Sequence, residues 1–145
     1  MVLRRPGNEP QVDGAMARVE LQLPGEPGSV RSARRLVSRT LLDWALPHLQ
    51  DAASLLTSEL VTNAVLHAKT GISVELYRHG AVLRVTVRDG SPQLAERRRH
   101  AVTAGTGRGL GLLTALAADW RSEPSGPPYR KAVWFELPLG PAAVP

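Results

Sequence analysis

The chain has 145 residues, of which 43% are hydrophobic and 21% are charged. These values are ordinary for one globular domain and exclude a disordered, collagenous or coiled-coil chain. The absence of cysteine excludes disulfides, thiolate nucleophiles and cysteine-ligated metal centres. The 18 basic residues, 16 arginines and two lysines, exceed the 13 acidic residues and give a net charge of +5. This surplus admits a nucleotide, a nucleic acid, membrane headgroups or an acidic protein as partner.

The ends of the chain differ in composition from its middle. Residues 1–16 are rich in glycine, proline, asparagine and aspartate, and residues 139–145 are mostly small residues and proline. We therefore expect flexible tails on either side of one domain over residues 17–138. No apolar run is long enough to span a membrane, so a cytoplasmic protein without a membrane partner is expected.

Alternation and helical spacing predict the first elements of the domain. Residues 17–23 alternate between apolar and polar side chains, which predicts a half-buried strand. Ser29 is the expected N-cap of a helix. The apolar stripe of that helix comprises Val30, Ala33, Val37, Leu41 and Trp44. A second helix, over about residues 50–68, is apolar nearly all round and is expected to be buried.

The second half of the domain is expected to be mostly strands. Residues 72–78 and 81–89, joined by His79 and Gly80, predict a tight hairpin. A loop is expected over residues 91–105 and a helix over residues 110–119. Two final strands are expected over residues 120–123 and 131–137. This order predicts an α+β fold, a two-layer α/β sandwich whose mixed, mostly antiparallel sheet has helices on one face.

Glu59 and Asn63 are the first candidates for chemistry. They lie four residues apart, and hence on one face, of the second expected helix. On an otherwise apolar helix these polar groups need partners. Asn63 could offer its carbonyl oxygen to Mg²⁺, and Glu59 could act as a general base. The alternative is that Glu59 is exposed and Asn63 bonds to backbone.

Two further motifs have a ligand-binding and a purely structural interpretation. A run of alternating glycines over residues 105–111 precedes an expected helix, where backbone N–H groups could approach a phosphate. Such runs also occur without a ligand, and this one is only a partial G-x-G-x-x-G. Asp89 ends an expected strand before Gly90, which is ordinary turn chemistry. Its carboxylate could instead accept from the amino group of adenine.

The order and spacing of these motifs resemble the N, G1 and G2 boxes of the Bergerat-fold (GHKL) ATPases, the superfamily of gyrase, Hsp90 and the histidine kinases. The boxes are Glu59 with Asn63, Asp89 with Gly90, and Gly107, Gly109 and Gly111. With residues 56–68 and 131–137 included, the chain looks most like the stand-alone anti-sigma factor serine/threonine kinases of Gram-positive, including actinobacterial, bacteria. The resemblance covers residues 17–138.

The resemblance implies the Bergerat type of sandwich, with ATP and Mg²⁺ as cofactors. It assigns Glu59 as the catalytic base, Asn63 as the Mg²⁺ ligand and Asp89 as the adenine partner. It also implies a mobile lid over residues 91–106. The remaining nucleotide-binding residues it implies are Gly90, Gly105, Thr106, Gly107, Arg108, Gly109, Leu110, Gly111 and Lys131.

The implied function is that of an anti-sigma factor that phosphorylates an antagonist protein. Its expected partners are a sigma factor, the antagonist or both, and a homodimer is possible. The family pattern Asp-x-Gly-x-Gly is altered here, because Gly90 directly follows Asp89 and Pro92 stiffens the next turn. A non-catalytic ATP-binding module that sequesters a regulator therefore stays open. Direct nucleic-acid binding is disfavoured, because no zinc finger, RNA-recognition motif or basic zipper is present.

Half of the arginines gather in two places. Arg31, Arg34, Arg35 and Arg39 belong to the first expected helix, and Arg97, Arg98, Arg99 and Arg108 to the loop and the glycine run. The second group could screen phosphate charge, and the first could face an acidic protein surface. Solvated charge on a loop is the alternative for the second group.

Overall fold

A computed structural model describes residues 2–4, 16–92, 116–117 and 119–140. Its strands are β1 (Val2–Arg4), β2 (Met16–Leu23), β3 (Ile72–His79), β4 (Val82–Asp89), β5 (Asp119–Pro124) and β6 (Lys131–Pro138). Its helices are α1 (Gly28–Asp43), the short 3-10 helix η2 (Pro47–Leu49) and α2 (Gln50–His67).

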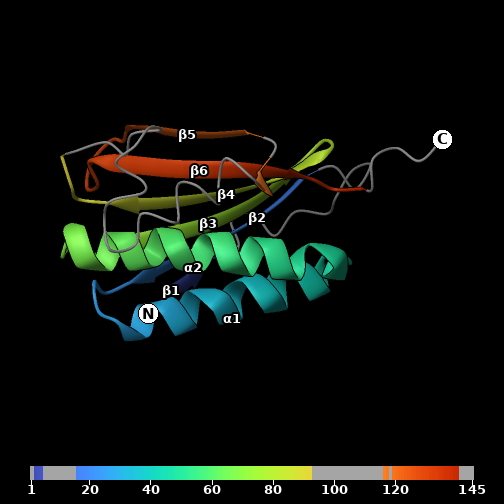
Figure 1. Ribbon diagram of the computed structural model, residues 1–145, viewed down its shortest axis with the longest axis horizontal. Coiled ribbons are helices and arrows are strands. Elements are labelled where there is room, and N and C mark those ends of the chain that lie inside the picture. The colour runs from blue at the N-terminus through green and yellow to red at the C-terminus, as the bar shows by residue number, and fades with distance from the viewer. Residues whose placement is uncertain (1, 5–15, 93–115, 118, 141–145) are drawn as a thin grey trace.

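The strands form one sheet in the order β1-β2-β3-β4-β6-β5, and every neighbouring pair is antiparallel. Helices α1 and α2 lie side by side against one face of this sheet (Figure 1). The expected α+β class and two-layer arrangement are therefore confirmed. Among the described strands the sheet is wholly antiparallel, with β6 rather than β5 beside β4.

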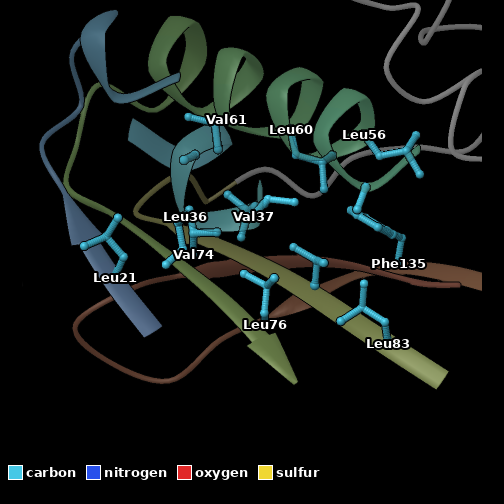
Figure 2. Close-up of a cluster of buried hydrophobic side chains, with 14 of the residues drawn as sticks. Leu21, Leu36, Val37, Leu56, Leu60, Val61, Val74, Leu76, Leu83 and Phe135 are labelled. Atoms are coloured by element: carbon cyan, nitrogen blue, oxygen red, sulfur yellow. The ribbon is translucent and has the colours of Figure 1, made fainter. Parts of the chain in front are cut away.

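The core fills the space between the two layers. Figure 2 shows Leu36 and Val37 of α1 and Leu56 and Val61 of α2 facing side chains of the sheet such as Phe135. Apart from Leu36, at 7% exposure, these side chains are completely buried. Because each large apolar side chain contributes about 1.5–3 kcal/mol on full burial, this interface is the main source of stability.

The first helix follows its expected stripe but begins differently. Ala33, Val37 and Leu41 are completely buried, whereas Val30 and Trp44 pack at the edge of the core. Ser29 is not the N-cap: Pro27 already has helical backbone angles, with φ −55° and ψ −34°, and holds that position. The Ser29 hydroxyl instead donates to the Pro24 carbonyl. The fixed φ of proline suits the first turn, so the helix begins earlier than predicted.

The second helix is buried on one side, not all round. Leu56, Leu60 and Val61 face the core, but Leu55 and Leu66 are 42% and 50% exposed. A helix in a two-layer fold packs one side on the sheet, so apolar residues elsewhere on its circumference need not be covered. The expectation that this helix is buried therefore holds for one side only.

Three expected boundaries also change. Val2–Arg4 belongs to the sheet through pairing with β2, although residues 1–16 were expected to be a tail. The turn between β3 and β4 is Gly80-Ala81, because His79 pairs with Val82, and Gly80 has the positive φ of +58° that favours glycine. Asp119 begins β5 and so cannot end the helix expected at 110–119.

None of the helices in the described ranges is long and apolar enough to cross a membrane.

Candidate functional site

Several candidate residues meet at one end of the sheet. Strand β4 ends there with Asp89, directly opposite Lys131, the first residue of β6. The turn between α2 and β3 reaches the same end, because the Thr70 hydroxyl contacts Gly90. Helix α2 ends at His67, three residues before Thr70, so its C-terminus lies near this end of the sheet. Chain segments far apart in sequence thus meet at this end of the sheet, and we call the site of Thr70, Asp89, Gly90 and Lys131 the polar corner.

Asp89 is the most deeply buried charged group of this corner, at 2% exposure. Its Oδ1 accepts from the Ser91 N–H at 2.8 Å, and its Oδ2 lies 3.5 Å from the Lys131 Nζ. The bond to Ser91 forms an Asx-turn, in which the side chain of an aspartate accepts from the backbone N–H two residues later. A carboxylate offers about four acceptor positions, so capacity remains for a further donor.

Lys131 is buried with Asp89, its side chain 11% exposed. The resemblance places both residues in a nucleotide site without indicating that they touch. Their contact follows from the pairing of β4 with β6, which sets them opposite each other. Arg130 adds a backbone contact next to this pair, because its N–H donates to the Asp89 carbonyl at 2.8 Å.

Thr70 is a structural contributor to the site that the sequence did not indicate. Its Oγ1 accepts from the Gly90 N–H at 2.8 Å. A Cβ at Gly90 would lie 2.9 Å from the Thr70 Cγ2, and one at Gly25 would lie 2.2 Å from the Thr70 carbonyl oxygen. Glycine directly after Asp89, the departure from the Asp-x-Gly-x-Gly pattern, is therefore a steric requirement of this contact.

Glu59 and Asn63 lie on α2 as the sequence predicts, four residues apart, and both are half-buried. Glu59 is thus neither fully exposed nor in the core. Within the described part of the chain its carboxylate has no hydrogen-bond or ion-pair partner. A half-buried, unpaired carboxylate is suited to accept a proton or a hydrogen bond from a ligand hydroxyl.

Ser58, beside Glu59, was also missed by sequence reasoning. Within the described residues, the buried hydroxyl oxygens of Ser58 and Thr57 have no hydrogen-bond partner. An unpaired buried hydroxyl is unfavourable by about 1–3 kcal/mol, so such atoms are candidates for water or ligand contact. Thr57 is completely buried in the core, so of these two hydroxyls only that of the half-buried Ser58 is placed for such a contact.

The rest of the expected site lies outside the described residues. These positions are Gly105, Thr106, Gly107, Arg108, Gly109, Leu110 and Gly111. What the structure brings to one side of the molecule is Asp89, Gly90 and Lys131 at the strand ends, with Glu59 and Asn63 on the helix that packs against β4. No three His, Asp or Glu side chains converge within the described ranges.

The fold and the site define a two-layer α+β domain with a buried carboxylate–ammonium pair at one end of its sheet. No protein-family model matches the chain, and no curated protein matches its sequence.

Proposed function

We propose that the protein is an ATP- and Mg²⁺-binding domain of the Bergerat type that acts as an anti-sigma factor and phosphorylates an antagonist protein on serine or threonine. The observation that carries the proposal is the buried Asp89 carboxylate at the sheet end beside α2, the helix of Glu59 and Asn63. This is the arrangement expected when an adenine-binding carboxylate and a phosphate-proximal helix share one ligand.

Asp89 supplies the base-recognition part of the proposal. Two protein groups hold its carboxylate in place, and its remaining acceptor capacity suits the exocyclic amino group of adenine. A base that presents a carbonyl oxygen at that position would set two acceptors against each other in a buried site. Discrimination against such a base is therefore expected to be strong.

Glu59 and Asn63 supply the catalytic part. Mg²⁺, when bound, neutralises charge on the transferred phosphoryl group. The oxygen donor of Asn63 suits this hard cation, which usually takes few protein ligands and completes its shell with phosphates and water. Glu59 would accept the proton of the partner's hydroxyl while that oxygen bonds to the γ-phosphorus and the bond to the ADP oxygen breaks.

The anti-sigma part of the proposal rests on the resemblance of residues 56–68, the glycine run and residues 131–137 to the anti-sigma kinases. Fold and motif do not identify a partner by themselves. The partners proposed are accordingly an antagonist protein as phosphoryl acceptor and a sigma factor as competing ligand, in the cytoplasm.

Calorimetry with ATP and Mg²⁺ tests the nucleotide site. We expect the wild-type chain to bind, and Asn63→Ala to lose Mg²⁺-dependent affinity by at least about tenfold, the effect of losing one charge-assisted contact of 1.4 kcal/mol. The matched control is Asp51→Asn, an exposed residue in the first turn of the same helix. Equal affinity of the wild type and Asn63→Ala would contradict the assignment.

Phosphotransfer from labelled ATP to candidate antagonist proteins tests the kinase activity. Glu59→Gln should retain ATP binding and lose transfer, because the amide cannot accept the hydroxyl proton. A second candidate function, ATP-dependent sequestration without catalysis, is favoured by the existing pairing of Asp89 with Lys131. That candidate replaces the kinase if ATP binds and no phosphate reaches any partner.

A further inference from the structure

The outward face of α1 is strongly basic. Arg31, Arg35 and Arg39 are spaced four residues apart, Arg34 directly precedes Arg35, and all four are exposed. The opposite side of the helix contains Ala33, Val37 and Leu41, which are completely buried. The arginines therefore form one surface about 12 Å long, at 1.5 Å per residue, and we call this surface, with Ser38, the arginine face.

The arginine face lacks the counter-charges that Arg18, Arg84 and Arg88 have on the sheet. Within the described part of the chain, none of its four guanidinium groups forms a hydrogen bond or ion pair. Like charges four residues apart, as in Arg31 with Arg35 and Arg35 with Arg39, destabilise a helix by a few tenths of a kcal/mol. Helix stability therefore does not account for this cluster, whereas an anionic ligand would.

The arginine face is hollowed, and it borders an exposed apolar side chain. Its four arginines and Ser38 line an open depression of about 570 Å³. Leu42 follows one turn after Ser38 on the same side and is 60% exposed, more than any other large hydrophobic residue that the structure describes. Guanidinium groups beside an exposed leucine are typical of protein–protein interfaces, in which arginine is enriched and buried apolar anchors supply affinity.

Carboxylates at both ends of the helix distinguish a protein partner from a nucleic acid. Glu26 precedes α1, Asp43 is its last residue, and Asp51 lies in the first turn of α2. Duplex DNA presents one negative charge per about 1.7 Å along its axis and would extend past the arginine face onto these acids. A short protein segment with a few carboxylates would contact only the arginine face and would not reach these acids.

We propose that the arginine face and Leu42 dock an acidic segment of a protein partner, with at least three carboxylates opposite the arginines and one apolar side chain against Leu42. Each guanidinium can bind a carboxylate through two parallel N–H bonds, so such a segment would satisfy the cluster. The proposal is independent of the nucleotide site, because α1 contains none of the residues assigned to ATP.

Fluorescence anisotropy with a labelled synthetic peptide tests the proposal. The probe is a 16-residue helical peptide with four glutamates and one leucine, and its control replaces each glutamate with glutamine. We expect the acidic peptide to bind and the glutamine peptide not to bind. The affinity for the acidic peptide should fall as the salt concentration rises. Arg34→Glu with Arg35→Glu should weaken binding by at least about tenfold, and Leu42→Ser by about threefold, typical of a lost charge pair and a lost apolar contact.

Arg121→Glu is the matched control, because Arg121 is also exposed but lies on β5, on the sheet. It should leave peptide binding unchanged, and thermal unfolding should show that all variants fold. The proposal is overturned if the acidic peptide does not bind, or if the α1 variants bind it as the wild type does. It is also overturned if a 20-base-pair duplex or phosphatidylserine vesicles bind more tightly than the peptide at equal salt and lose that binding in Arg34→Glu with Arg35→Glu.

Discussion

The arginines of the sheet and those of α1 are the same residue type in two opposite electrostatic settings. On the sheet face away from the helices, Arg84 donates from Nε and Nη2 to Glu136 at 2.9 and 2.6 Å, and its guanidinium lies 3.8 Å from the centre of the Trp134 ring. Glu75 likewise pairs with Arg88 at 2.9 Å and with Arg18 at 3.1 Å. The arginines of α1 have no such partners in the described part of the chain.

The difference shows which charges belong to the fold and which are free for another molecule. Antiparallel register sets Arg84 directly opposite Glu136, so the sheet itself supplies its counter-charge. The spacing along α1 sets arginine next to arginine, and the helix cannot neutralise them. Paired charges should therefore affect stability when they are changed, and the unpaired charges of α1 should affect binding.

The largest stability effect is expected at the most buried pair. Lys131→Met should lower the free energy of unfolding by about 3–5 kcal/mol, because it leaves the Asp89 carboxylate buried without a counter-charge. Urea denaturation measures this. The control is Lys131→Met combined with Asp89→Asn, which removes both charges and should recover most of the loss. A single variant as stable as the wild type would show that the contact does not stabilise the fold.

An intermediate effect is expected on the outer face of the sheet. Glu75→Gln should cost about 1–2 kcal/mol, because one carboxylate serves both Arg18 and Arg88 and is only 13% exposed. Glu26→Gln, in the exposed segment before α1, should change the urea midpoint very little. Equal effects of the two substitutions would contradict the distinction between paired and unpaired charges.

The smallest effect is expected on α1. Arg34→Gln with Arg35→Gln should stay within about 0.5 kcal/mol of the wild type, with a slight gain at low salt as like-charge repulsion is relieved. This gain should vanish near 1 M salt, where the screening length is about 3 Å. Thermal unfolding at the two salt concentrations measures both effects. A loss above about 1 kcal/mol would assign these arginines to the fold.

Local patterns predicted most of the elements of the fold. Alternation located β2, β3, β4 and β6 to within one or two residues, and helical spacing located α1 and α2. Two of the errors arose where a contact distant in sequence decides the local structure. Val2–Arg4 is too short to show a period and becomes a strand because β2 is beside it. The shift of the turn to Gly80-Ala81 likewise depends on the pairing of His79 with Val82.

The candidate site was predictable as residue types and spacings but not as contacts. Glu59 and Asn63 were recognisable because their four-residue spacing lies within one helix. Thr70 was not, because its importance comes from its hydroxyl at Gly90 and its carbonyl oxygen near Gly25, both far away in the chain. These contacts exist only once β3, β4 and the segment before α1 have assembled.

By itself, the sequence determined the α+β class, the burial stripe of α1 and the clustering of four arginines on that helix, because a repeat of 3.6 or 2 residues is a local property. The tertiary structure decided which charges are neutralised. Strand pairing sets Lys131 opposite Asp89 and Glu136 opposite Arg84, whereas packing on the sheet turns the arginines of α1 outward. Neutralisation depends on neighbours across strands, and periodicity along one chain does not encode those neighbours.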